Sequence, residues 1–272
     1  MKPFLKWAGG KTQLLPELRK YSPPKFNRYY EPFVGAGARL FDLRPERAVI
    51  NDINGDLINC YQVIKLWPLE LVSVLQDYIN SESVYYLIRD MDRKQDFKYR
   101  HPIIKAARFV YLNKNGFNGL CRYNSKGQFN VPYGKHKNDY IPDIETITAV
   151  SQYLNQNNVT IHNMDFENSV VDARAGDFVY FDPPYHPASE TANFTAYTAG
   201  GFALRDQIRL METAIKLHER GVYVMISNSH TTAMTALYSV PVFTIHQVQA
   251  KRNINSKGDN RGNVGELIIT SY

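Results

Sequence analysis

The fold of this chain is decided by residues 28–52, which read RYYEPFVGAGARLFDLRPERAVIND. A short strand runs into a glycine-containing turn at 33–37, a helix begins at Ala38, and a second apolar strand at 48–52 ends in Asp52. Strand, glycine turn, helix and strand in this order form one βαβ unit. The glycines let the backbone approach a ligand closely at the start of a helix, and the aspartate can accept hydrogen bonds from ribose hydroxyls.

The rest of the chain continues this alternation of strands and helices. Further apolar strands are expected at 159–162, 178–182, 222–228, 242–248 and 266–272, and helices at 12–20, 56–75, 101–115, 145–155, 203–220 and 231–238. Strands that alternate with helices predict a doubly wound, Rossmann-like α/β sheet. The last two strands have no helix between them, so they predict an antiparallel hairpin at the sheet edge.

The positive charge is concentrated in one segment. Residues 89–140 hold twelve Lys and Arg against four acids, although the formal net charge of the whole chain is only +6. Such a segment is expected to face a polyanion, but a solvated helical face would carry the same charges. Its turn dipeptides indicate loops or a hairpin at 115–134. We expect residues 57–143 to form a smaller, inserted target-recognition domain, and 1–56 with 144–272 to form the catalytic domain.

The composition excludes several classes of protein. A hydrophobic fraction of 44% with 21% charged residues is typical of a globular protein, and no apolar run is long enough to cross a membrane. The N-terminal residues lack the apolar core of a signal peptide. Cys60 and Cys121 form no CxxC pair and the histidines show no HxxxH spacing, so neither a metal site nor a disulfide framework is expected. A cytoplasmic location is expected because that compartment is reducing.

Two glycine motifs are excluded by single residues. A dinucleotide-binding GxGxxG motif would need a glycine where Leu40 follows Gly35 and Gly37, which argues against a nicotinamide or flavin cofactor. A phosphate-binding loop ending at residues 10–12 would need a glycine in place of Leu5, so an NTPase is rejected. The remaining pair of glycines is compatible with a tight turn in any α/β protein, and by itself it assigns no function.

The chemistry is indicated by residues 178–185, which read FVYFDPPY. An apolar strand ends here in the candidate catalytic residues Asp182, Pro183, Pro184 and Tyr185, at the sheet edge where open α/β folds bind ligands. The amino nitrogen of adenine is a poor nucleophile because its lone pair is delocalised into the ring. A carboxylate and the Pro183 carbonyl, each accepting one of its N–H groups, would localise that pair, and Tyr185 offers a ring on which an extruded base can stack. This chemistry relies on positioning and electrostatics without a metal, but a plain strand-ending turn would contain the same residues.

Five motifs occur in an order that resembles one family. They are KWAGGK at 6–11, EPFVGAG at 31–37, NGLCRYN at 118–124, FNVPYG at 129–134 and DPPY at 182–185. Together they closely resemble the Dam-type DNA adenine methyltransferases of the D12 class, alpha group, and ANFTAY at 192–197 is similar to the loop that follows their catalytic tetrapeptide. The resemblance spans essentially the whole chain. It implies methylation of adenine N6 within GATC of double-stranded DNA, with base flipping.

The resemblance also implies S-adenosylmethionine as the cofactor, with S-adenosylhomocysteine as its product. The implied cofactor contacts are Trp7, Lys11, Phe33, Gly35, Gly37, Asp52, Asp165, Phe166 and Asp182, and the implied DNA contacts are Lys6, Phe117, Asn118, Leu120, Arg122, Asn124, Pro132 and Lys135. Lys6 and Arg122 would touch guanines, and Leu120 with Pro132 would make apolar base contacts. Asn124 and Lys135 would touch phosphates. Lys135 replaces an arginine of some relatives, which puts a bidentate contact in doubt.

The residue types of the insert support the same assignment. Arginine bound to guanine O6 and N7 is the commonest specific contact in the major groove. Phe117, between Gly116 and Asn118 on a loop, is expected for a side chain that wedges into the base stack, and it stands where some relatives carry tyrosine. The alternative is a small core cluster with Phe109 and Tyr111.

Two rival functions remain open at this point. A methyltransferase of this chemistry would also suit RNA adenine or the amide of a protein glutamine, and a DNA-binding protein that has lost catalysis could retain the fold. The presence of Asp52 and Asp182 favours an enzyme. The basic loop at 251–261 is expected either to order on DNA or to remain solvated. The chain would act alone, in a phage, or beside a restriction endonuclease that shares its sites without binding to it.

Overall fold

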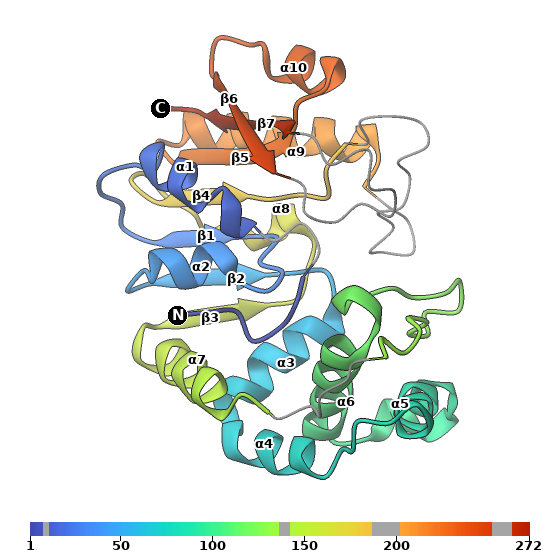
Figure 1. Cartoon of the computed structure of the whole chain (residues 1–272). Coiled ribbons are helices and arrows are strands. Elements are labelled where there is room, and N and C mark those ends of the chain that lie inside the picture. The colour runs from blue at the N-terminus through green and yellow to red at the C-terminus, as the bar shows by residue number, and fades with distance from the viewer. Residues whose placement is uncertain (8–10, 136–141, 187–201, 252–262) are drawn as a thin grey trace.

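The structure is a computed structural model that describes residues 1–7, 11–135, 142–186, 202–251 and 263–272. A single seven-stranded sheet forms its centre, with the strand order β3-β2-β1-β4-β5-β7-β6 (Figure 1). The strands are β1 (Tyr29–Glu31), β2 (Ala48–Asn51), β3 (Val159–His162), β4 (Phe178–Phe181), β5 (Tyr223–Ser229), β6 (Thr244–Lys251) and β7 (Asn263–Thr270).

The sheet is parallel except for its last two strands. β1 pairs in parallel with both β2 and β4, whereas β7 is antiparallel to β5 and to the edge strand β6. The predicted doubly wound sheet and its antiparallel hairpin are therefore confirmed. The strand order reverses between β1 and β4, and ligands of open α/β sheets bind at such a reversal, outside the carboxyl ends of the strands.

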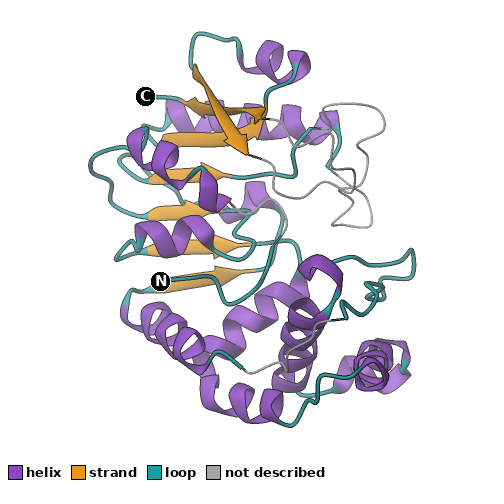
Figure 2. Ribbon diagram, viewed as in Figure 1, coloured by secondary structure: helices purple, strands orange, loops and turns teal. Residues whose placement is uncertain are grey.

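Helices cover both faces of the sheet (Figure 2). The helices are α1 (Leu15–Lys20), α2 (Ala38–Leu43), α3 (Gly55–Leu66), α4 (Pro68–Gln76), α5 (Glu82–Arg89), α6 (Pro102–Asn115), α7 (Ile144–Gln156), α8 (Phe166–Ser169), α9 (Leu204–Glu219) and α10 (Thr232–Tyr238), with short 3₁₀ turns at Lys11–Gln13, Asp90–Arg93, Gln95–Tyr99 and Phe117–Gly119. Successive strand residues face opposite sides, so Tyr29 packs in the core with Leu18 and Leu40, whereas Tyr30 packs with Leu210 of α9.

The continuous helix expected over residues 56–75 is instead two helices. α3 ends at Leu66 and Pro68 opens α4, because proline has no N–H to continue the ladder and restricts the residue before it. α3 packs against α6 and α7, and one hydrophobic core runs from the sheet through α3 to Phe109 of α6. The helical part that carries the basic segment is thus attached to the sheet by continuous apolar packing.

Residues 116–135 extend from the end of α6 as a hairpin, which we call the recognition hairpin. Antiparallel bridges join Gly116 to Tyr133 and Tyr123 to Phe129, as the turn dipeptides predicted. Among the residues that the structure describes, no helix combines the length and the apolarity needed to cross a membrane.

Candidate active site

The turns that follow β1, β2 and β4 meet at one edge of the sheet. The pairing of β1 with both neighbours brings the glycine turn, Asp52 and the Asp182–Tyr185 tetrapeptide to this edge. The register aligns Tyr30 with Val49 on one side and with Val179 on the other, so the three strands end side by side. The sequence motifs at 31–37 and 182–185 are therefore neighbours in space, as the predicted topology requires.

Asp182 forms an ion pair with Lys11 at the end of β4. Lys11 Nζ lies 2.9 Å from Asp182 Oδ1, in a site where the side chains are only 9% and 18% exposed. The same ammonium lies 4.3 Å from the centre of the Tyr185 ring, which adds a cation–π contact. Burial raises the pKa of Asp182 to about 6, and the nearby Lys11 limits that rise. The carboxyl is therefore mostly ionised at neutral pH.

The remainder of the tetrapeptide is held by hydrogen bonds. The Tyr185 hydroxyl donates to Glu266 Oε2 on β7 over 2.9 Å, and burial raises the pKa of this tyrosine well above its ordinary value. The Pro184 carbonyl accepts from Gln207 Nε2 at 3.0 Å. Among the described residues, no hydrogen bond uses the Pro183 carbonyl. That carbonyl is the acceptor that the sequence singled out beside Asp182.

The glycine turn after β1 has the backbone that its sequence predicts. Gly35 and Gly37 have φ values of +50° and +76°, which side chains with a Cβ rarely adopt. A Cβ at Gly35 would lie 2.9 Å from the Trp7 indole, so Trp7 packs directly against the turn. Asp52 accepts from the backbone N–H of Gly35 at 3.1 Å and of Asn54 at 2.9 Å. Burial raises its pKa to about 6.

An aromatic wall lies beside this turn. The rings of Phe33 and Phe166 stack with centres 5.4 Å apart, and Phe202 packs edge-on against Phe33 at 5.7 Å. Asp165 caps α8 and forms an ion pair with Arg209 at 3.1 Å. This edge of the sheet thus combines an open glycine backbone, the acid Asp52 after β2, and an aromatic wall with a second acid, Asp165. Such a set fits a nucleoside that carries a charged tail, which is the chemistry expected for S-adenosylmethionine.

Lys6 lies against the recognition hairpin. Its backbone N–H donates to Asn113 Oδ1 at 2.9 Å, and Asn113 Nδ2 donates to the carbonyls of Lys6 and Gly119 at 2.8 and 3.0 Å. A Cβ at Gly119 would come within 2.6 Å of the Lys6 side chain. Lys6 therefore lies next to the hairpin, which carries the other residues predicted to contact DNA.

Most of the predicted DNA contacts on the hairpin are exposed. Phe117 is 50% exposed, whereas Phe109 and Tyr111 are buried, so these three residues do not form a core cluster. Asn118, Arg122, Pro132 and Lys135 are also exposed, and Leu120 is partly buried against the core. The Arg122 guanidinium is oriented by Asn130, since its Nε donates to Oδ1 at 2.8 Å.

Asn124 differs from the other predicted contacts. Its Oδ1 accepts from the backbone N–H groups of Lys126 and Gln128, both at 3.0 Å, and its Nδ2 donates to the Gln128 side chain. The side chain therefore closes the tip of the hairpin in the free protein. A contact between Asn124 and phosphate stays a prediction. It would have to use the N–H of Asn124 Nδ2 that does not donate to Gln128.

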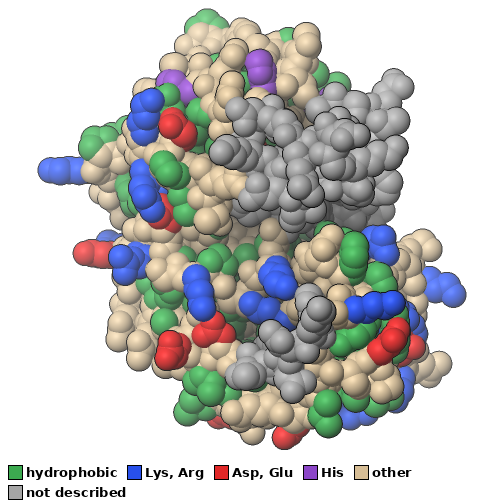
Figure 3. Space-filling model, in the orientation of Figure 1, with side chains coloured by type: hydrophobic (Ala, Val, Ile, Leu, Met, Phe, Trp, Pro, Cys, Tyr) green, Lys and Arg blue, Asp and Glu red, His purple; other side chains and the backbone are tan. Residues whose placement is uncertain are grey.

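The basic segment divides into two parts. On α5, α6 and the turns between them, Arg93 and Arg108 pair with Asp92, and Arg100 pairs with Asp96. This part resembles the solvated, internally paired surface that the sequence left open as an alternative. The second part consists of the hairpin cations, among them Arg122 and Lys135, which are exposed. Figure 3 shows Lys and Arg side chains gathered on the helical part of the molecule near its border with the sheet.

The N-terminal end of α3 links the glycine turn to the hairpin. The backbone N–H of Asn54 donates to Asp52, and its side-chain Nδ2 donates to Cys121 Sγ at 3.7 Å. Two residues later, Asp56 Oδ2 accepts from the Tyr123 hydroxyl at 2.7 Å. Residues 52–56 thus connect the expected ribose-binding carboxylate with Cys121 and Tyr123, which both lie on the first half of the hairpin.

Sequence reasoning missed three residues that hold the tetrapeptide. Glu266 contacts Tyr185, Gln207 contacts Pro184, and Asn228 contacts Gln207. Gln207 and Asn228 are completely buried. The available signals were a glutamine on the apolar face of the helix expected at 203–220 and a polar run that ends the strand expected at 222–228.

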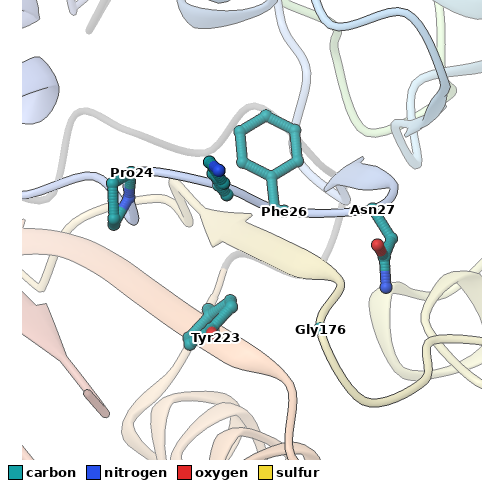
Figure 4. A pocket seen from close by; sticks show the side chains of 6 residues that line it. Pro24, Phe26, Asn27, Gly176 and Tyr223 are labelled. Atoms are coloured by element: carbon teal, nitrogen blue, oxygen red, sulfur yellow. The ribbon is translucent and has the colours of Figure 1, made fainter.

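Other features of the structure lie away from this edge. A surface pocket lined by Pro24, Lys25, Phe26, Asn27, Gly176 and Tyr223 opens near the amino ends of β1, β4 and β5, opposite the tetrapeptide (Figure 4). No cluster of metal-ligating side chains is found among the described residues. The expected features at 8–10, 192–197 and most of 251–261 lie outside the described residues.

The sequence is similar to known proteins over its full length. The model of the family described as D12 class N6 adenine-specific DNA methyltransferase matches residues 7–254. The type II methyltransferase M1.LlaDCHI of Lactococcus lactis subsp. cremoris is 46% identical, covering 100% of this chain and 96% of its own. M.MjaIII, a type II methyltransferase of Methanocaldococcus jannaschii, is 41% identical with 100% and 99% covered. A DNA adenine methylase of Escherichia coli strain K12 is 39% identical with 97% and 93% covered.

Proposed function

The chain belongs to the D12 class of N6 adenine-specific DNA methyltransferases, and from this premise we propose that it uses S-adenosylmethionine to methylate adenine within GATC of double-stranded DNA. The observation that carries the proposal is the meeting of Asp182 with the glycine turn at the switch point of the sheet. The extruded adenine would enter beside this carboxylate and stack on the face of the Tyr185 ring that Lys11 does not cover.

The residues of the tetrapeptide have distinct roles in the proposed reaction. Lys11 engages Oδ1 of Asp182, so we assign Oδ2 to one N–H of the adenine amino group and the Pro183 carbonyl to the other. Two acceptors held in this way localise the nitrogen lone pair and direct it toward the methyl group. Tyr185 stacks on the flipped base, and Glu266 fixes the ring through the tyrosine hydroxyl.

S-adenosylmethionine, when bound, supplies an electrophilic methyl group on a positively charged sulfur. Trp7 and the Gly35–Gly37 turn would hold its tail, Asp52 would accept the ribose hydroxyls, and Asp165 with Phe166 would hold the adenine. Asp52 already accepts two backbone N–H groups, but an ionised carboxylate offers about four acceptor positions, so capacity remains for a ribose.

The proposed DNA-contacting part is the insert at 57–143, and within it the recognition hairpin. Phe117 is exposed at the start of the hairpin, as a wedge into the base stack must be. Arg122 is exposed and already oriented by Asn130, which suits recognition of one guanine, while Lys6 lies alongside to reach another.

Both cysteines are free and buried, which supports a reducing cytoplasmic location.

Labelled methyl transfer tests the proposal. The protein is incubated with tritiated S-adenosylmethionine and either a GATC duplex, the same duplex already methylated at adenine N6, a scrambled duplex, or RNA of the same sequence. Label is expected only on the unmethylated GATC duplex, which should then resist a restriction enzyme that is blocked by adenine methylation. Equal labelling of the scrambled duplex would refute the GATC assignment, and an unlabelled GATC duplex would refute the proposed substrate.

A further inference from the structure

Three buried polar side chains hold the backbone on both sides of Tyr185. Gln207 Nε2 of α9 donates to the Pro184 carbonyl at 3.0 Å, on the N-terminal side of the tyrosine. On its C-terminal side, Asn228 Oδ1 accepts from the His186 N–H at 3.3 Å, and Ser229 Oγ donates to the His186 carbonyl at 2.6 Å. We call Gln207, Asn228 and Ser229 the polar relay.

The hydrogen bonds of the polar relay fix the orientation of both side-chain amides. Asn228 Oδ1 also accepts from the Ser229 N–H at 2.9 Å, and Asn228 Nδ2 donates to Gln207 Oε1 at 2.9 Å. Each amide therefore both accepts and donates, so neither can turn over without leaving buried groups unpaired. Gln207 and Asn228 are 0% exposed and Ser229 is 2% exposed, which keeps water from substituting for a lost bond.

The relay distinguishes two neighbouring carbonyls. The Pro184 carbonyl is taken by Gln207, whereas no hydrogen bond among the described residues uses the Pro183 carbonyl. Proline has no N–H and a fixed φ, so each of the two carbonyls turns about its own ψ alone. The bond to Gln207 therefore fixes the Pro184 carbonyl and leaves the Pro183 carbonyl as the acceptor without a partner among the described residues.

We infer that Gln207, Asn228 and Ser229 are positioning residues for methyl transfer, which hold the Tyr185 ring and the Pro183 carbonyl in the arrangement that an extruded adenine requires. The inference rests on the proposed function, since it concerns the same pocket. The relay acts through the backbone on either side of Tyr185, which its bonds hold. Its contribution is to the rate of the chemical step, because that step depends on placement within a fraction of an ångström, whereas binding depends on contacts made elsewhere.

Substitution of Gln207 tests the relay directly. Gln207→Leu removes both bonds, and Gln207→Glu preserves the shape but replaces the donor to Pro184 with an acceptor when ionised. The matched control is Thr213→Val on the same helix, where a buried hydroxyl donates to the Arg209 carbonyl at 2.8 Å, outside the relay. Each protein is measured for its single-turnover methylation rate on GATC duplex, its Kd for DNA, its Kd for S-adenosylmethionine, and its Tm.

The expected result separates rate from binding. Both Gln207 variants should lose about 10- to 100-fold in rate, with each Kd within about twofold of the wild-type value, because a misplacement of about 1 Å costs a factor of this size. Thr213→Val should retain the wild-type rate. An unchanged rate in a folded Gln207→Leu protein would overturn the inference, and so would a loss of rate that is matched by equal losses of cofactor and DNA binding.

A second pair of variants decides the matter if Gln207 proves necessary for folding. Asn228→Asp replaces the donor to Gln207 by a carboxylate oxygen of the same size, and Ser229→Ala removes only the bond to the His186 carbonyl. Both should lower the rate without changing either Kd, and unchanged rates in both would overturn the inference. A wild-type protein that fails to methylate the duplex would instead refute the proposed function, so the two failures are distinguishable.

Discussion

The tetrapeptide at the end of β4 and the recognition hairpin differ in how their predicted functional side chains are placed. Around the tetrapeptide, the ion pair of Asp182 and the bonds to Pro184 and Tyr185 come from three different elements, and the supporting side chains are largely buried. The hairpin is held at its first half by α3 and closed by its own bridges and the Asn124 turn, but Phe117 at its start is half exposed.

This difference fits the two tasks that we propose for these regions. Methyl transfer requires groups that are already in place, so its residues have found their partners within the protein. Reading of a base sequence requires donors that are satisfied only by the correct partner, so the corresponding side chains face outward. Changes at the first region should therefore affect rate, and changes at the second should affect affinity and discrimination.

The largest effect is expected at Asp182. Asp182→Ala removes one of the two acceptors for the amino group, and the methylation rate should fall about 100- to 1000-fold, because one lost electrostatic contact at a reacting centre costs a factor of this size. The Kd for DNA should stay within a few fold. Single-turnover methylation and a DNA-binding titration measure the two quantities. Asp182→Asn, which retains the size, should show a similar loss of rate, and retained turnover in either variant would contradict the assigned role.

Arg122 should give the next largest effect, and of a different kind. Arg122→Ala should reduce discrimination at one base pair of the site by about 1–3 kcal/mol, with weaker discrimination confined to that position. Competition binding with each single-base variant of the site provides the measurement. Lys126→Ala, an exposed cation on the same hairpin, is the matched control and should leave the discrimination pattern unchanged. An equal loss on all duplexes would show that Arg122 contacts phosphate.

The acid side of the pH profile should depend on Asp182. Its carboxylate must be ionised to accept an N–H, and its pKa is about 6, so kcat/KM should fall by about tenfold per pH unit well below that value. Lys11 lowers the pKa, so Lys11→Met should move this limb to higher pH. Asp52 has a pKa of about 6 as well. A limb that does not move in Lys11→Met would assign it to Asp52 instead.

The smallest effect is expected at the end of the hairpin. Lys135→Ala should weaken binding to all duplexes alike and reduce the slope of log Kd against log salt by about 0.9, the value for one lost phosphate contact. Titrations at several salt concentrations test this. A loss of discrimination at one base pair with an unchanged slope would move Lys135 from the backbone to a base.

The order and type of most elements could be predicted from local sequence. The strand at 159–162 has the expected bounds and a helix begins at Ala38 as expected, because apolar runs and turn glycines define them locally. The break between α3 and α4 was missed although Pro68 marks it. The apolar periodicity continues through that proline, so the pattern alone predicts one helix although proline has no N–H to continue it.

The partners of the site could not be predicted in the same way. Lys11 and Asp182 are separated by 171 positions in the chain, and Tyr185 and Glu266 by 81. Contacts between side chains so far apart in the chain can be predicted only when the strand order is known. The sequence by itself does not reveal which of them pair. The charge count had the same weakness, because it could not show that Asp92 neutralises Arg108.

The short link at the start of α3 has a thermodynamic consequence. Asn54 contacts Asp52 through its backbone and Cys121 through its side chain, so one residue shares its bonds between the place expected for the methyl donor and the segment expected to read DNA. If occupancy of one place tightens these bonds, the other place gains affinity, and the gain must be equal in both directions. The enzyme would then bind its site on DNA most tightly when the methyl donor is already bound.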